Sequence, residues 1–184
     1  MKVVIVGNGK VGNSLADRLS SEGHDVVVID NDPENLKNSD TRMDIFTVLG
    51  KGVSYTVQLE AGVPKADLLV AATPSDECNM LCCLVAHKLG AQHTIARIRN
   101  PEYNDKSLGF LRQQLGLSMA INPEKLAARE LFDILKLPSV VKIEAFAGRS
   151  FEMIELILHE NSALCGMSLS ELRNHYSESF LVCV

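Results

Sequence analysis

The chain has 184 residues and a formal net charge of −5, and 46% of its residues are hydrophobic. That length suffices for one domain with a sizeable core and for part of a second. The acidic balance argues against a nucleic-acid-binding protein, which usually presents a basic face. No apolar run approaches the roughly 18 residues that a membrane-spanning helix needs, so we expect no direct insertion into a membrane.

The N-terminus and the cysteines favour a cytoplasmic protein. Gly7, Asn8 and Gly9 interrupt the first apolar run, so we expect no signal peptide. The five cysteines are odd in number and lack CxxC spacing, which favours reduced thiols. Cys78 and Cys82 lie four residues apart among apolar neighbours, and we expect them to be buried structural thiols. The histidines show no metal-binding spacing, so no metal site is expected.

Short apolar runs alternate with helical patterns over residues 1–138. The expected strands are residues 2–7, 25–30, 45–50, 66–73, 93–98 and 118–121. The expected helices are residues 10–23, 32–43, 54–62, 74–89, 100–116 and 122–138. Because parallel neighbours need long connections, this alternation predicts an α/β fold, a Rossmann-like doubly wound parallel sheet of six strands.

Two helix starts carry capping patterns. Asp32 precedes Pro33, which suits an N-cap followed by proline at the first helical position. Thr73 precedes Pro74, and Asp76 follows three residues after Thr73. This resembles a capping box with Asp in place of Glu or Gln, so Thr73 is the predicted N-cap.

After Pro138 the pattern changes, and we expect a second, smaller α+β lobe over residues 139–184. Residues 140–146 and 150–158 read as extended runs, residues 168–176 as a helix, and residues 180–184 as a final strand. Ser168 and Glu171 form a capping box at the start of that helix. An apolar strand at the end of a chain usually continues to a partner, so we expect an incomplete lobe.

The motif Gly7-Asn8-Gly9-Lys10-Val11-Gly12 matches G-x-G-x-x-G between a predicted strand and a predicted helix. In a dinucleotide-binding unit Gly7 permits the turn, Gly9 lets a pyrophosphate approach, and Gly12 packs the helix on the sheet. The N-terminus of the helix offers N–H groups to the phosphates. The alternative is an ordinary strand-to-helix turn.

Asp30 ends the second predicted strand at the spacing expected for a ribose-binding carboxylate. It would repel a 2′-phosphate, and neither Asn31 nor Asp32 supplies a cation for one. We therefore expect NAD(H), or an adenosine di- or triphosphate such as ADP or ATP, rather than NADP. The alternative for Asp30 is a solvated turn residue.

Further candidate cofactor-binding residues follow the other strands. They are Asn31, Lys51 in the glycine-containing loop 48–53, Thr73, Pro74, Asp76 and Arg97. Lys51 could lie beside the adenine, although a plain turn is also consistent with this loop. Thr73 and Asp76 either face the crevice or only cap a helix. Arg97 either reaches the phosphates or forms a salt bridge at the edge of the sheet, because a cation in an apolar strand needs a partner.

The stretches MKVVIVGNGKVGNSLADRL, HDVVVID, EAGVPKADLLVAATPSDECNM and ARIRNPEY together resemble the NAD-binding regulatory subunits of Trk-type potassium uptake systems (TrkA). This is the RCK or KTN domain family. The likeness is dense over residues 1–137 and looser over 140–184, which resembles the start of an RCK-C lobe. It departs at Lys51, where many relatives carry an acidic residue.

The resemblance implies a non-catalytic, cytoplasmic nucleotide sensor that gates a membrane potassium transporter or channel. It would lie at the inner membrane through that partner and assemble as dimers within an octameric ring. Residues 7–12 and Arg97 would contact the phosphates, and Asp30 the ribose. The helix 123–137 would be the crossover helix that packs on a partner subunit.

The alternative function is an NAD-dependent oxidoreductase. Such an enzyme needs a substrate pocket and an acid–base group near the nicotinamide. The residues after the nucleotide unit offer only His159 and His175, without a catalytic constellation, so the sequence favours a regulatory protein.

Overall fold

The computed structural model describes residues 1–40, 45–103, 105–136, 140–146, 151–162 and 164–175. The chain divides into two compact units, Met1–Lys125 and Leu126–Val184. This division falls inside helix α6 (Pro123–Lys136), and the domain boundary at residue 138 stays a prediction.

The first unit is built on one six-stranded parallel sheet, as predicted. The strands are β1 (Lys2–Val6), β2 (Asp25–Asp30), β3 (Ile45–Leu49), β4 (Leu68–Ala71), β5 (His93–Arg97) and β6 (Met119–Ile121), in the order β3-β2-β1-β4-β5-β6. Several are shorter than expected, because the flanking residues of the apolar runs lie in the connecting loops.

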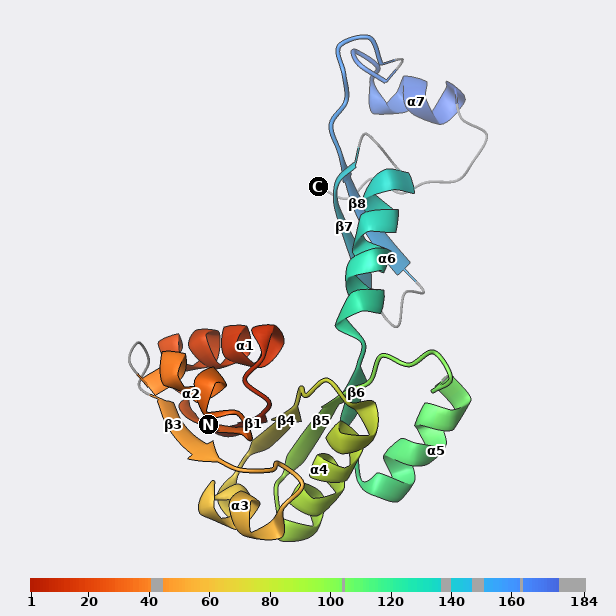
Figure 1. Ribbon diagram of the computed structural model, residues 1–184. Coiled ribbons are helices and arrows are strands. Elements are labelled where there is room, and N and C mark those ends of the chain that lie inside the picture. Colours follow the sequence, from red (N-terminus) through yellow and green to blue (C-terminus); the bar gives the residue numbers. More distant parts are fainter. Residues whose placement is uncertain (41–44, 104, 137–139, 147–150, 163, 176–184) are drawn as a thin grey trace. The chain divides into compact units, whose positions relative to one another are not determined.

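Helices cover both faces of this sheet (Figure 1). One face carries α1 (Lys10–Ser21) and α2 (Pro33–Asp40); the other carries α3 (Tyr55–Glu60), the 3₁₀ turn η1 (Val63–Lys65), α4 (Asp76–Leu89) and α5 (Asp105–Leu115). Side chains alternate along β1. Val3 and Ile5 therefore pack in the core on the face of α1 and α2, and Val4 and Val6 pack in the core on the face of α3, α4 and α5. Burial on both faces explains the continuous apolar strands.

The strand order reverses its direction between β1 and β4. Val4 of β1 lies opposite Val27 of β2 on one side and Leu69 of β4 on the other. In such open sheets, ligands bind beyond the carboxyl ends of the strands at this point. The loops after β1, β2 and β4 therefore meet where the sequence predicts a site.

Helix α4 starts two residues later than the capping pattern predicted. Ser75 is its N-cap, with an Oγ that accepts a hydrogen bond from the Cys78 backbone N–H at 3.2 Å. Thr73 is therefore not the cap, and its hydroxyl instead donates to Asn79 Oδ1 at 2.7 Å. The predicted cap of α2 is correct, because the Glu34 N–H donates to Asp32 Oδ1 at 2.9 Å.

The second unit holds most of α6, an antiparallel pair of β7 (Val140–Phe146) and β8 (Phe151–Leu156), and α7 (Leu169–His175). The predicted capping box is present, since the N–H of Ser168 donates to Glu171 Oε2 at 2.7 Å and the N–H of Glu171 to Ser168 Oγ at 3.3 Å. The predicted strand 180–184 lies outside the described residues. Among the described helices, none combines the length and apolarity that crossing a bilayer requires.

Candidate functional site

A cavity of about 860 Å³ opens in the first unit beyond the carboxyl ends of β1, β2, β4 and β5. This volume is typical of small-molecule sites. Most of the predicted site residues line it: Gly7, Gly9, Lys10, Val11, Asp30, Asn31, Lys51, Thr73, Pro74 and Arg97. Asn8, Gly12 and Asp76 lie outside this lining.

Gly7 and Gly12 allow the loop after β1 to turn and to pack closely. Gly7 has a φ of +95°, a conformation that residues with a side chain rarely adopt. A Cβ on Gly12 would lie 1.8 Å from the carbonyl oxygen of Gly7. This geometry agrees with the roles that the motif assigns to these two glycines.

Gly9 differs, because the protein itself does not require a glycine there. A Cβ on Gly9 would meet no atom within 4 Å, and the residue lines the cavity. Gly9 is also the N-cap of α1 and makes no side-chain capping bond. The first N–H groups of α1 are thus available beside Lys10 and Val11, an arrangement that attracts anions.

Asp30 is anchored beneath the glycine-rich loop. Its Oδ2 accepts from the Asn8 backbone N–H at 2.6 Å, and its Oδ1 from the Asp32 N–H at 2.9 Å and Asn35 Nδ2 at 3.3 Å. The side chain is buried. A carboxylate has roughly four lone-pair positions, so two ribose hydroxyls could both bind only if the long Asn35 contact yields.

Lys51 lies on a loop whose position depends on Gln58, which the sequence did not single out. Gln58 is fully buried, and its Nε2 donates to the carbonyls of Gly52 at 2.7 Å and Cys82 at 3.0 Å. A Cβ on Gly52 would lie 2.1 Å from Val6 Cγ1. The loop therefore presses on the end of β1 and forms one wall of the cavity.

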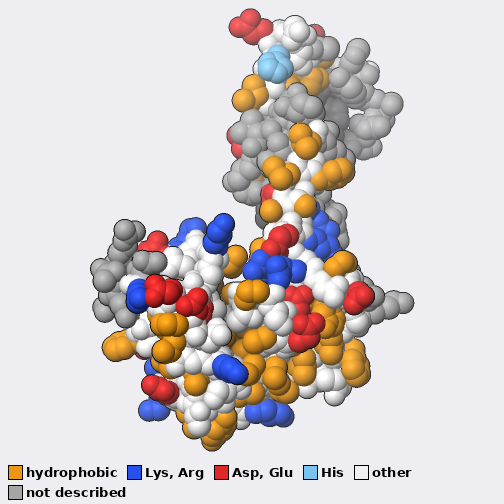
Figure 2. Space-filling view, in the orientation of Figure 1, with side chains coloured by type: hydrophobic (Ala, Val, Ile, Leu, Met, Phe, Trp, Pro, Cys, Tyr) orange, Lys and Arg blue, Asp and Glu red, His pale blue; other side chains and the backbone are white. Residues whose placement is uncertain are grey.

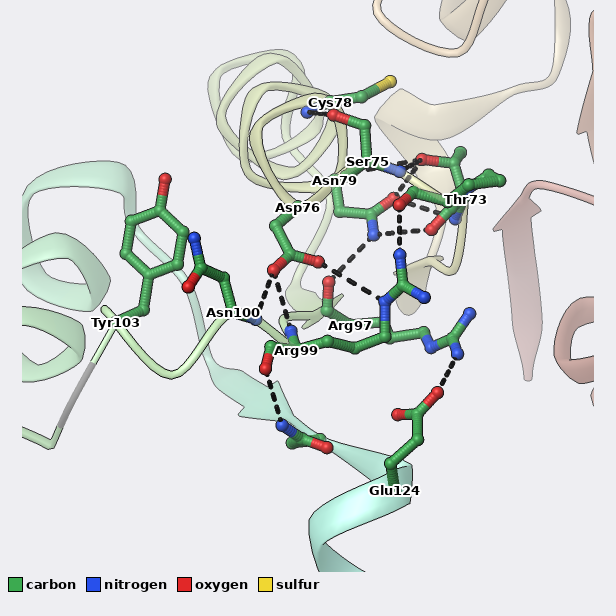
Figure 3. Close-up of polar contacts among 12 residues, drawn as sticks. Thr73, Ser75, Asp76, Cys78, Asn79, Arg97, Arg99, Asn100, Tyr103 and Glu124 are labelled. Atoms are coloured by element: carbon green, nitrogen blue, oxygen red, sulfur yellow. Dashed lines mark hydrogen bonds and ion pairs between the residues drawn. The ribbon is translucent and has the colours of Figure 1, made fainter.

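Asn79 is the second buried amide that the sequence did not indicate, and it lies amid the contacts in Figure 3. Its Oδ1 accepts from the Thr73 N–H at 2.8 Å and from Thr73 Oγ1 at 2.7 Å. Its Nδ2 donates to the carbonyls of Thr73 at 3.1 Å and Arg97 at 2.8 Å. One side chain on α4 thus fixes the ends of β4 and β5.

Asp76 holds the segment after β5. Its Oδ2 accepts from the backbone N–H groups of Arg99 at 2.8 Å and Asn100 at 2.7 Å, and its Oδ1 lies 3.8 Å from Arg99 Nε. Arg99 also donates to the carbonyl of Pro74. The carboxylate is buried, and it contacts the Arg99 side chain and the backbone of Arg99 and Asn100.

Arg97 forms a salt bridge, one of the two alternatives raised by the sequence, while its contact with phosphates stays a prediction. It lines the cavity, and its Nη2 forms an ion pair with Glu124 Oε1 (Figure 3). Its Nε is buried and has no hydrogen-bond partner among the described residues. The pKa of Glu124 lies below its usual range because its own backbone hydrogen bond and the Arg97 guanidinium favour the carboxylate.

The thiols of α4 divide between the cavity and the core. Cys78 is only partly buried and lines the cavity, so it is not the buried thiol that we expected. Cys82 and Cys83 are buried, and desolvation raises the pKa of both. Cys78 Sγ and Cys82 Sγ lie 3.9 Å apart.

Charged side chains of both signs line the cavity. Lys10, Lys51 and Arg97 supply positive charge, and Asp30 and Asp32 supply carboxylates. Of the residues described around this cavity, none is a histidine or a tyrosine. The described part of the chain holds no group of three or more side chains suited to a metal ion.

Comparison with known proteins gives a family. The family model of the TrkA-N domain matches residues 3–123. The chain is 34% identical over 176 residues to the Trk system potassium uptake protein TrkA of Halomonas elongata, which covers 95% of this chain and 38% of that protein. It is 35% identical over 177 residues to TrkA of Haemophilus influenzae, covering 95% of this chain and 39% of that protein. The chain thus spans about two fifths of the length of these relatives.

Solved structures share the fold. The TrkA-N domain of the inner membrane protein ybaL from Escherichia coli matches with a TM-score of 0.64 and 21% identity, covering 73% of this chain and 96% of that one. GsuK bound to ADP matches with a TM-score of 0.55 and 20% identity, covering 66% of this chain and 31% of that one. The GsuK channel bound to NAD gives the same TM-score and identity over 65% of this chain and 21% of that one.

Proposed function

The chain belongs to the TrkA-N domain family, and from that premise we propose that it is a regulatory protein of potassium transport that senses a nucleotide in the cavity beyond β1 and β4. The observation that carries the proposal is the pairing of the buried Asp30 carboxylate with the uncapped start of α1 across one cavity. A ribose and a pyrophosphate need these two features side by side.

The ligand that suits these residues best is NAD(H), with ADP or ATP as the alternative. Lys10, Lys51 and Arg97 offer charge to phosphates, and Asp30 disfavours a 2′-phosphate. GsuK, a structure of the same fold, binds ADP and NAD, which supports both ligands for this chain.

The partner that we propose is a membrane potassium transporter or channel, since the relatives are named as Trk potassium uptake proteins. The protein would then be cytoplasmic and held at the inner membrane by that partner. An assembly of dimers within a ring is supported by α6, on which Leu126, Leu131, Phe132 and Leu135 are exposed. Figure 2 shows hydrophobic side chains along this helix. An exposed apolar face of this kind favours association.

A regulatory role also suits the chemistry of the cavity better than the alternative of an NAD-dependent oxidoreductase. Hydride transfer needs an acid–base group within hydrogen-bond reach of the substrate. Asp30, the buried carboxylate of the lining, is already tied to backbone N–H groups at the expected ribose position. No observation in the cavity favours catalysis over binding.

Binding is tested by calorimetry with NAD, NADH, ADP and ATP, after mass spectrometry of the denatured protein for any nucleotide that co-purifies. Asp30→Asn should weaken binding by about ten-fold or more, since charged hydrogen bonds contribute roughly 1.5–3 kcal/mol each. Asp17→Asn, on an exposed part of α1, is the matched control. Absence of binding to all four nucleotides at millimolar concentration would refute the proposal.

Sensing is tested separately by X-ray scattering. A sensor must bind its ligand unequally in two states, so different nucleotides should change the assembly to different extents. Superimposable scattering curves for the free and all liganded forms would contradict a sensing role while leaving binding intact.

A further inference from the structure

A single guanidinium stands between the cavity and the first turn of α6. Arg97, at the end of β5, lines the cavity and forms an ion pair with Glu124, which lies in the first turn of α6 outside the cavity lining. Glu124 contacts Nη2 only, and the buried Nε has no partner among the described residues. The carboxylate therefore leaves part of the guanidinium unsatisfied.

We propose that Glu124 is an internal competitor for Arg97 and so a specificity-determining residue that weakens the binding of anionic ligands to the cavity. This inference rests on the proposed function, in which a nucleotide phosphate approaches Arg97. Phosphate and carboxylate both seek the same guanidinium, and a phosphate can accept two parallel hydrogen bonds from it. The more negative a ligand is near Arg97, the more strongly Glu124 opposes it.

The exposure of the pair makes such competition possible. The Arg97 side chain is 17% exposed and that of Glu124 is 54% exposed. An ion pair with one largely solvated partner is weak, so a phosphate can displace the carboxylate. The backbone of Arg97 need not move, because its carbonyl is held by Asn79 Nδ2 at 2.8 Å. Only the guanidinium has to change partner.

The start of α6 keeps its other contacts when the ion pair breaks. Asn122 caps the helix, since the Lys125 N–H donates to its Oδ1 at 2.8 Å, and its Nδ2 donates to the Arg99 carbonyl at 3.1 Å. The loss of Glu124 as a partner is therefore a change of charge at a folded helix start. By linkage, a ligand that takes Arg97 also releases Glu124.

The test compares the wild type with Glu124→Gln in the full chain, by calorimetry with ADP in buffer without divalent cations. The glutamine removes the charge and keeps the shape. We expect ADP to bind about two- to five-fold more tightly, a change equivalent to a weak surface ion pair. Glu130→Gln, an exposed position farther along α6, should leave the affinity unchanged. Adenosine, which lacks phosphate, should bind Glu124→Gln and the wild type equally when followed by NMR.

A double-mutant cycle distinguishes competition from a structural effect. In an Arg97→Gln background, Glu124→Gln should no longer change the affinity for ADP. Equal or weaker ADP binding by Glu124→Gln, a gain that persists without Arg97, or the same gain with adenosine would each overturn the inference. If the wild type itself bound neither ADP nor NAD, the proposed function would fail, and the inference would fall with it.

Discussion

Asn79→Ala should destabilise the first unit and weaken nucleotide binding together. The substitution removes the partners of the Thr73 N–H and of the Arg97 and Thr73 carbonyls around a fully buried side chain. A buried polar group that loses its partner costs about 1–3 kcal/mol. The Thr73 N–H and the Arg97 carbonyl both lose their partner, and alanine returns up to about 0.7 kcal/mol through its better helix propensity. The free energy of unfolding should therefore fall by about 1–5 kcal/mol.

The assay is urea unfolding followed by far-UV circular dichroism, since the chain contains no tryptophan. Gln114→Ala removes an exposed amide from α5 and serves as the control, with an expected change within about 0.5 kcal/mol. Asn79→Asp distinguishes the contribution of the amide oxygen from that of the amide nitrogen. The carboxylate keeps an acceptor for the Thr73 N–H but loses the donor to the Arg97 carbonyl. A loss below about 1 kcal/mol for Asn79→Ala, or an Asn79→Asp variant as stable as the wild type, would refute this account of the site.

Three further outcomes follow from the geometry of the cavity and its helix. Gly12→Ala should destabilise the fold by about 1–3 kcal/mol or more in urea unfolding, because its Cβ would lie 1.8 Å from the Gly7 carbonyl oxygen. Gly9→Ala should preserve stability and weaken ADP binding. A Gly9→Ala variant less stable than Gly12→Ala would contradict the roles of the two glycines. Maleimide should label Cys78 faster than the buried thiols of α4, and saturating ADP should slow the labelling of Cys78. An unchanged labelling rate with ADP bound would place the ligand elsewhere. Burial raises the pKa of Cys83 to about 12, so with rising pH this thiol ionises in the unfolded chain before it ionises in the folded one. The free energy of unfolding should therefore fall as pH rises above about 9. Cys83→Ala should show a shallower fall, and an unchanged slope of the free energy against pH would argue against a buried neutral thiol.

The strands of the first unit were predictable because burial on both faces requires continuous apolar, β-branched runs such as Val3–Val6. The start of α4 was not, since Thr73 and Ser75 are both good caps on either side of Pro74. Only the packing of Thr73 against Asn79 decides between them. Local sequence thus located the helix but not its first residue.

The candidate site likewise contains residues that the sequence could indicate and residues that it could not. Gly7, Gly9 and Asp30 belong to a spacing that is typical of dinucleotide-binding units, so the sequence indicated them, and all three line the cavity. Gln58 and Asn79 act by contacts with residues distant in the sequence. The sequence alone does not distinguish a buried amide on a helix from an exposed one, so neither residue was predicted. The pairing of Arg97 with Glu124 likewise depends on where α6 begins relative to β5.

The two buried amides have a consequence for how the cavity responds to its surroundings. Gln58 holds the loop that carries Lys51, and Asn79 holds the ends of the strands that carry Thr73 and Arg97. Amide side chains neither gain nor lose a proton over the range in which proteins fold. Acidification of the surroundings therefore leaves these supports uncharged and in place, and a pH effect on ligand affinity has to arise from the ligand or from ionisable groups around it.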